Sequence, residues 1–128
     1  MRVAIKDVAY YLPTQIVTND DLLKENPDWK MDLIRARSGV EQRHIAKKNE
    51  TALDLSLSAC QQLFLKNEEL FDQVDGLICC TQSPDYIMPP NACILHKALD
   101  LSETVFAFDF NLACSGYVYG LALAQGLI

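Results

Sequence analysis

The chain has 128 residues, of which half are hydrophobic and 22% are charged, and its formal net charge is −6 at pH 7. A chain of this length buries about two-thirds of the surface that it exposes when unfolded, so we expect one folded domain over residues 1–128 rather than a disordered chain. The negative charge argues against nucleic-acid binding, because phosphate contacts need a basic surface.

The cysteines and the N-terminal stretch indicate the cellular compartment. There are five cysteines, with no C-x-x-C pair and one left over, which favours reduced thiols in a cytoplasmic protein. Lys6 and Asp7 lie where a signal peptide needs an unbroken apolar segment, so we expect no export. Cys93 and His96 have the spacing C-x-x-H, but no second ligand pair lies near them in the sequence, and we predict no metal site.

The first predicted elements are a strand over residues 2–10, which ends before Pro13, and a short helix after it. Thr18 and Asp21 have the spacing of a capping box, in which a hydroxyl and a carboxylate each bond the other residue's backbone N–H. The helix closes before Pro27, because proline cannot continue it.

A longer helix is predicted from Thr51, with Asp54 as its capping carboxylate and apolar residues recurring every three or four positions. The apolar run over residues 74–80 suits a strand covered on both faces. A helix entered through proline over 88–100 and a strand over 104–110 follow, with one more helix after them. This alternation predicts a layered α/β domain with a sheet that is at least partly parallel.

Residues 105–128 carry a single charge and are long enough to cross a bilayer. Asp109 and Asn111 would be costly in hydrocarbon, and the three glycines of this segment weaken a lone helix. We therefore predict no membrane span.

Cys114 differs from the other cysteines in its position. It lies where the last predicted strand gives way to a helix that begins near Ser115. A thiolate there faces the positive end of the helix dipole, and the thiolate is the species that attacks carbonyl carbon. The other four cysteines are best explained as small core residues, which is also the alternative explanation for Cys114.

Five of the eleven basic residues lie between Arg35 and Lys48, against a lone Glu41. This basic run has two explanations: a solvated loop, or a docking patch for an anionic ligand or an acidic partner.

Four segments in order along the chain resemble one enzyme family. NLACSGYVYGLALA (111–124) resembles the active-site cysteine segment of the β-ketoacyl-acyl carrier protein synthase III family, whose members have the thiolase fold. SGVEQRHIAKKNET (38–51) and YYLPTQIVTNDDL (10–22) are similar to two further motifs of that family. PDYIMPPNACILHKAL (84–99) is in register with the part that precedes the catalytic strand.

The resemblance implies the N-terminal half of a five-layered αβαβα condensing enzyme. It implies that Cys114 accepts an acyl group from acyl-CoA and that the acyl-enzyme then condenses with a malonyl thioester. A histidine and an asparagine from a C-terminal half beyond residue 128 assist that second step. The chain alone is thus expected not to condense. Acyl-CoA and acyl carrier protein are the implied partners, coenzyme A enters as part of a substrate, no cofactor is implied, and a homodimer is expected.

The resemblance also implies three substrate-binding residues. Trp29 and Arg37 are similar to the pair that holds the adenine and phosphates of CoA, although more residues separate them than is usual in the family, and Arg35 is an alternative partner. Met88 matches the position that reaches across the dimer to form the floor of the partner's acyl pocket. The alternatives are a surface anchor for Trp29 and ordinary interface packing for Met88.

The predicted function is therefore that of a 3-oxoacyl-ACP synthase III-like acyltransferase in fatty-acid or related acyl biosynthesis. The alternative is a non-catalytic subunit that keeps the fold to bind acyl-CoA or an acyl carrier, with the basic run as its main support. A thiol hydrolase is a third hypothesis, but the sequence has no G-x-S-x-G or papain-type segment.

Overall fold

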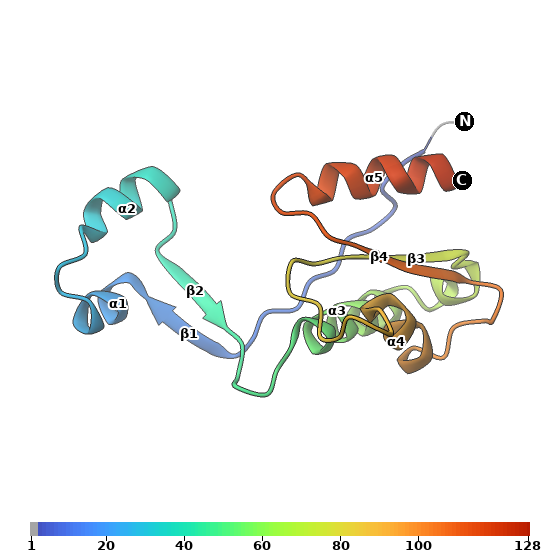
Figure 1. The fold of residues 1–128 in the computed structure, drawn as a ribbon, viewed down its shortest axis with the longest axis horizontal. Helices are drawn as coiled ribbons and strands as arrows, with labels where there is room; N and C mark the ends of the chain where they lie inside the picture. Colours follow the sequence, from blue (N-terminus) through green and yellow to red (C-terminus); the bar gives the residue numbers. More distant parts are fainter. Residues whose placement is uncertain (1–2) are drawn as a thin grey trace. The chain divides into compact units, whose positions relative to one another are not determined.

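The computed structural model describes residues 3–128, which form two compact units. The larger unit consists of the N-terminal stretch to Tyr11 together with Thr51–Ile128, and the smaller unit is Leu12–Glu50 (Figure 1). We expected one folded domain over residues 1–128. The division into two compact units does not test that expectation, which stays a prediction.

The smaller unit is an antiparallel strand pair with two helices between the strands in sequence. Its elements in chain order are β1 (Gln15–Thr18), α1 (Asn19–Glu25), α2 (Met31–Ser38) and β2 (Gln42–Ile45). The predicted capping box opens α1: the Asp21 N–H donates to Thr18 Oγ1 at 3.2 Å, and the Thr18 N–H donates to Asp21 Oδ2 at 3.1 Å. The Thr18 hydroxyl, which donates to Asp21 Oδ2 at 2.6 Å, and the Lys24 ammonium hold the pKa of Asp21 well below its usual range. The helix ends before Pro27, as predicted.

The larger unit is built around a parallel strand pair. Its elements are α3 (Ala52–Lys66), the 3₁₀ helix η1 (Glu68–Gln73), β3 (Gly76–Cys80), α4 (Asn91–Ala98), β4 (Phe106–Phe110) and α5 (Gly116–Leu127). In the ladder, Gly76 lies opposite Phe106 and Cys80 lies opposite Phe110. The predicted α/β alternation and the parallel pairing are thus confirmed, and Thr51 caps α3 through Asp54 as expected.

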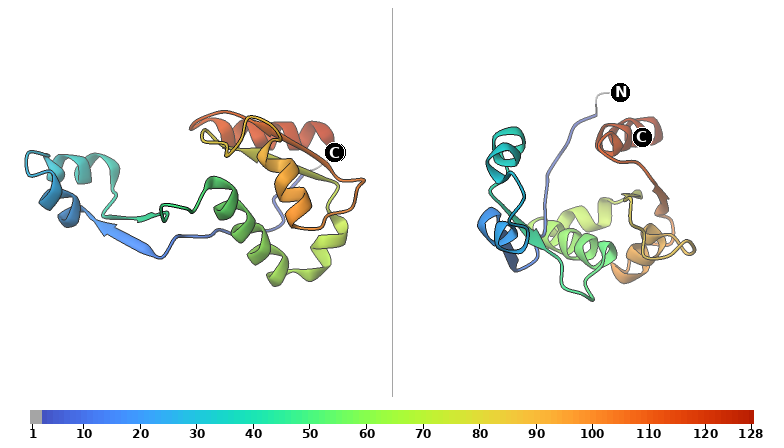
Figure 2. Two further views of the ribbon diagram at one scale, coloured as in Figure 1. Left: turned by 60° about the horizontal axis from the view of Figure 1, so that its bottom comes forward. Right: turned by 60° about the vertical axis from the view of Figure 1, so that its left-hand side comes forward.

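Helices cover both faces of the β3–β4 pair. In Figures 1 and 2, α5 lies on one face and α3 and α4 lie on the other. Cys79 of β3 packs with Ala92 and Leu95 of α4, and Leu53 and Leu57 of α3 pack against that cluster. The predicted strand with both faces covered is confirmed for residues 76–80. Leu77 and Cys79 pack with the cluster of α3 and α4, and Cys80 lies against Gly116 at the start of α5.

The strand predicted over residues 2–10 is wrong for residues 3–10, which form no strand, while residue 2 lies outside the described residues. Alternating apolar residues form a strand only where a neighbouring strand offers backbone bonds, and the ladder of β3 is with β4. Side chains hold the segment instead, since Lys66 Nζ donates to Asp7 Oδ1 at 2.8 Å and Asn67 Nδ2 donates to Asp7 Oδ2.

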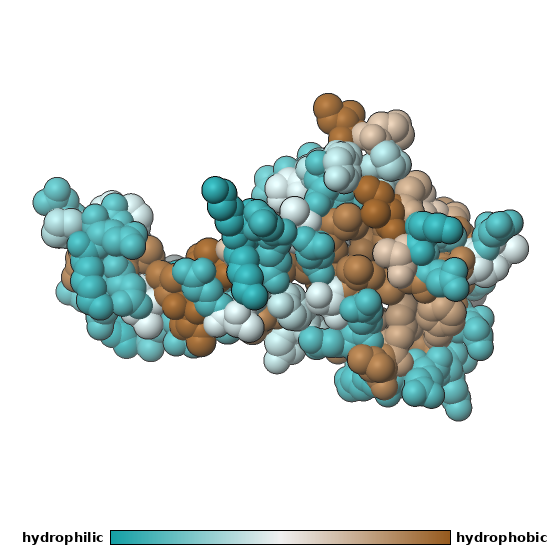
Figure 3. Space-filling view, turned by 90° about the horizontal axis from the view of Figure 1, so that it is seen from below, coloured by the Kyte–Doolittle hydropathy of each residue, from teal (hydrophilic) through white to brown (hydrophobic). Residues whose placement is uncertain are grey.

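Hydrophobic side chains reach the surface in several places, and Figure 3 shows patches of them on the face seen from below. On α5, the side chains of Tyr117, Val118 and Tyr119 are exposed although the helix is apolar almost all round. Across residues 3–128, no helix has both the length and the apolar character that crossing a membrane requires.

Candidate functional site

Cys114 lies in the turn that joins β4 to α5. The Gly116 N–H donates to the Ala113 carbonyl at 2.8 Å, which closes a turn with Cys114 and Ser115 at its centre. Cys114 is exposed, and α5 begins two residues later. The sequence predicted this position, at the boundary between strand and helix.

The thiol of Cys80 packs beneath the same turn. Cys80 Sγ lies 3.6 Å from the Leu112 carbonyl oxygen, to which it donates. On the other side of Cys114, a Cβ added to Gly116 would lie only 2.5 Å from that sulfur. The absence of a side chain at Gly116 therefore lets the start of α5 approach the end of β3.

Asp109 of β4 supplies the cap of α4. Its Oδ2 accepts the Asn91 N–H at 2.8 Å, and its Oδ1 accepts the Ala92 N–H at 2.7 Å. The N-cap residue of α4 is Pro90, whose side chain has no polar atom to offer. A carboxylate from a neighbouring strand thus takes the place of a local cap.

The side chain of Asn91 extends this network into the loop before α4. Asn91 is fully buried; its Oδ1 accepts the Asp85 N–H at 3.1 Å, and its Nδ2 donates to Asp85 Oδ1 at 3.2 Å. Asp85 Oδ1 also accepts the Leu53 N–H at 3.1 Å, at the start of α3. Sequence reasoning missed this network. Its one signal was Asp109, a lone carboxylate inside an apolar strand.

Within the smaller unit, Trp29 and Arg37 line the same surface hollow of about 530 Å³. The remaining lining residues are Asp28, Lys30, Leu33 and Ile34. Trp29 lies in the turn before α2, and Arg37 lies in the last turn of that helix. Arg35, the alternative partner, is ion-paired with Glu41 and does not line the hollow.

The basic run is not one uniform patch. Arg35 is paired with Glu41, and Arg43 Nη2 donates to Asn19 Oδ1 at 2.7 Å. Lys47 and Lys48 are exposed. Part of the positive charge is therefore used inside the smaller unit.

Met88 lies in the loop between β3 and α4, where 79% of its surface is exposed. Its neighbours Tyr86 and Ile87 are also exposed, so three apolar side chains stand together at the tip of this loop. A hollow of about 260 Å³, which Tyr86 and Ile87 help to line, lies at the carboxyl ends of β3 and β4.

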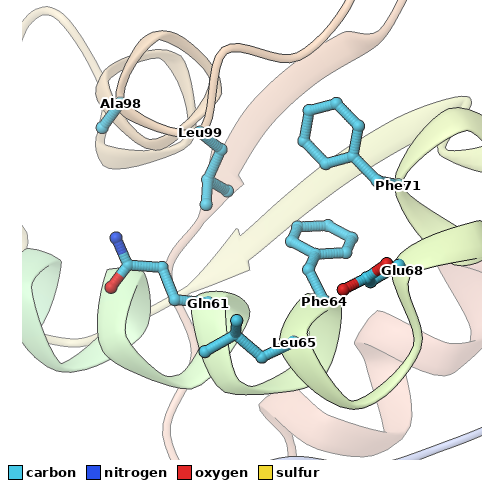
Figure 4. Close-up of a pocket in the computed structure, with 7 residues that line it drawn as sticks. All are labelled: Gln61, Phe64, Leu65, Glu68, Phe71, Ala98 and Leu99. Carbon is cyan, nitrogen blue, oxygen red and sulfur yellow. The ribbon is translucent and has the colours of Figure 1, made fainter.

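Another hollow of the larger unit lies among α3, η1 and α4 and measures about 640 Å³ (Figure 4). Phe64 and Phe71 meet edge to face in it, with ring centroids 5.3 Å apart. None of the predicted site residues lines this hollow. His96 of α4 contacts the Ser102 carbonyl oxygen through Nε2, and within residues 3–128 no group of three His, Cys, Asp or Glu side chains is placed to hold a metal ion.

Solved structures share this arrangement along nearly all of the chain. A 3-oxoacyl-(acyl-carrier-protein) synthase III matches it with a TM-score of 0.90 and 48% identity, over 98% of this chain and 37% of that one. The synthase III of Thermus thermophilus gives a TM-score of 0.88 at 28% identity, over 98% and 38%. The OleA protein of Xanthomonas campestris, 20% identical with a TM-score of 0.77 over 91% and 36%, has the same fold. This is a thiolase-like α/β fold, the class to which condensing enzymes belong.

The sequence comparisons give relatives from one family within that class. No family model matches the chain. The β-ketoacyl-[acyl-carrier-protein] synthase III of Streptococcus agalactiae is 39% identical over 97% of this chain, and that of Oenococcus oeni is 40% identical over 98%. The chain is similar to the β-ketoacyl-acyl carrier protein synthase III family along nearly all of its length. It spans about 38% of the length of these two curated relatives.

Proposed function

We propose that this chain supplies the acyl-accepting cysteine of a 3-oxoacyl-ACP synthase III-like condensing enzyme of fatty-acid or related acyl biosynthesis. One observation carries the proposal: Cys114 is exposed in the turn that leads from β4 into the N-terminus of α5. An exposed sulfur at this position is open to a substrate.

The proposed step is the transfer of an acyl group from acyl-CoA to Cys114. The thiolate attacks the thioester carbonyl carbon, and a new carbon–sulfur bond forms to Cys114. The bond between that carbon and the CoA sulfur then breaks, and the CoA thiolate leaves and takes a proton from water. Backbone N–H groups at the turn, that of Cys114 among them, stabilise the charge on the carbonyl oxygen.

Trp29 and Arg37 are proposed to bind the adenine end of CoA. They line one hollow, so an indole face and a guanidinium are available to the same ligand, for stacking on a base and for pairing with phosphate. Arg37 is preferred over Arg35 because the guanidinium of Arg35 is already paired with Glu41.

We expect the chain to form homodimers, with Met88 of each copy closing the acyl pocket of the other. The described ladder of β4 is with β3 alone, which leaves the opposite edge of β4 for a second copy. Sedimentation at micromolar concentration is expected to give a species of twice the 14.4 kDa mass of the chain. A sharply monomeric profile over a tenfold dilution range would contradict this expectation.

The proposed compartment is the cytoplasm, where the thiols stay reduced.

Alkylation by iodoacetamide tests the activation of Cys114. Cys80, Cys93 and Cys114 are all exposed, so exposure alone predicts similar rates for these three thiols. As the proposed nucleophile, Cys114 is expected to be labelled at least about threefold faster than Cys80 and Cys93, as measured by mass spectrometry of peptides from a time course.

The other two cysteines serve as internal controls for that experiment. Burial raises the pKa of the Cys79 thiol to about 11, with the Asp109 carboxylate adding to the effect, and burial also raises the pKa of Cys60. Both thiols should therefore be labelled last. Equal labelling of Cys80, Cys93 and Cys114 would remove the case for an activated nucleophile.

The second candidate function is a non-catalytic module that binds acyl-CoA or an acyl carrier. The exposed Lys47 and Lys48, together with the Trp29 hollow, favour binding without any need for Cys114. Binding of acyl-CoA with no acyl group left on the protein would support this function against the first.

A further inference from the structure

We propose that Asp85, Asn91 and Asp109 are positioning residues that set which acyl chains the site accepts. They fix the base of the loop over residues 81–90, whose apolar tip carries Met88. The inference rests on the proposed function, in which that tip forms the floor of the partner's acyl pocket.

Part-buried hydrogen bonds join the middle of the loop, at Asp85, to the start of α4, at Asn91. Asn91 is 0% exposed, and both polar atoms of its side chain bond Asp85. Asp85 in turn accepts the Leu53 N–H at the start of α3. A buried amide that loses a partner is costly, so this base has one favoured arrangement.

Asp109 joins that base to the strand that leads to Cys114. Its carboxylate holds the N–H groups of Asn91 and Ala92, and one residue later β4 ends at Phe110. Asp109 therefore ties the end of the loop, at Asn91, to the strand that leads into the turn of Cys114.

The tip of the loop is apolar and exposed to solvent. Ile87 is 97% exposed and Met88 is 79% exposed, above a base in which the polar side chains are bonded. A hydrogen-bonded base below an exposed apolar tip suits a loop that packs into the acyl pocket of a second copy. The turn of Cys114 has separate contacts, through Cys80 and through the bond from Gly116 to Ala113. A shift of the tip should therefore change the room for the acyl chain and leave the nucleophile in place.

The experiment compares Asp85→Ala with Asp85→Asn in the acylation of Cys114. Asparagine keeps an Oδ1 that accepts from Leu53 and Asn91, whereas alanine keeps none. The rates of acylation by acetyl-CoA and by hexanoyl-CoA are measured for each protein. Asp85→Ala is expected to change the ratio of the two rates by about threefold or more, and Asp85→Asn is expected to keep the ratio of the unsubstituted chain. If Asp85→Ala does not fold, Asn91→Ser, which removes the Nδ2 donor, is measured in its place.

Iodoacetamide labelling of Cys114 serves as the control, with the same rate expected in both variants. Loss of both acylation rates by one common factor would overturn the inference, because a structural role alone predicts that result. If the unsubstituted chain accepts no acyl group, the proposed function fails, and cleavage by chymotrypsin after Tyr86 then tests the positioning role by itself. Faster cleavage in Asp85→Ala than in Asp85→Asn supports the role, and equal cleavage overturns it.

Discussion

Replacing Cys114 by alanine is expected to abolish the transfer of a radiolabelled acyl group from acyl-CoA to the protein, by at least about a thousandfold. The acyl group needs a sulfur nucleophile in the turn before α5, and a methyl side chain offers none. The measurement is the radioactivity that remains on the protein after denaturation and gel separation, for the Cys114→Ala variant and the unsubstituted chain.

Cys93→Ala is the matched control, because Cys93 is an exposed thiol on α4. It is expected to retain the full transfer of label. Label that persists in Cys114→Ala would show that another residue accepts the acyl group. Label that is absent even from the unsubstituted chain, while acyl-CoA still binds, would favour the non-catalytic module.

Replacing Asp109 by alanine is expected to lower the free energy of unfolding by about 2–4 kcal/mol. The change removes the acceptor of two N–H groups at the start of α4, and one of them belongs to the fully buried Asn91. Urea denaturation followed by circular dichroism gives the difference.

Asp54→Ala provides the comparison for that loss. Asp54 caps α3 by accepting the Thr51 N–H at 2.9 Å, but this cap is exposed to water, which can replace the bond. We expect a cost of about 1 kcal/mol for its removal. Equal losses in Asp54→Ala and Asp109→Ala would show that burial adds nothing to the role of Asp109.

The sequence predicted the helices whose starts carry a local signal. The Thr18–Asp21 and Thr51–Asp54 pairs are each three residues apart, so their capping boxes can be read from the sequence, and both form. Helix α2 was missed, because its N-cap, Lys30, makes no side-chain capping bond. Its remaining signal is Gly39, which ends the helix with a φ of 69°, in the region that favours glycine.

The strands, like the helices, were predicted where a local sequence signal was present and were missed where it was not. The run over 74–80 predicted β3 because both faces of that strand are covered. β1 and β2 have only four residues each and mix polar with apolar side chains, so their pairing depends on contacts that are remote in sequence. The predicted strand over residues 2–10 had the composition of a strand but lacks a partner ladder in the part that the structure describes.

The candidate site also has one part that the sequence predicted and other parts that it did not. The placement of Cys114 could be predicted, because it depends only on where one strand ends and the next helix begins. The joint hollow of Trp29 and Arg37 depended on α2, which the pattern did not reveal. The network of Asp85, Asn91 and Asp109 joins three separate segments through buried polar bonds, and no local spacing encodes such bonds.

The contact between Cys80 and Gly116 couples the substitutions that these two positions tolerate, although they lie far apart in sequence. A lineage that acquired alanine at position 116 would gain a methyl group in space that the sulfur now fills. Such a change could persist only after residue 80 had become smaller or had turned away. Descendants of this chain would thus inherit the two sites as a pair, and the order in which they mutate would matter.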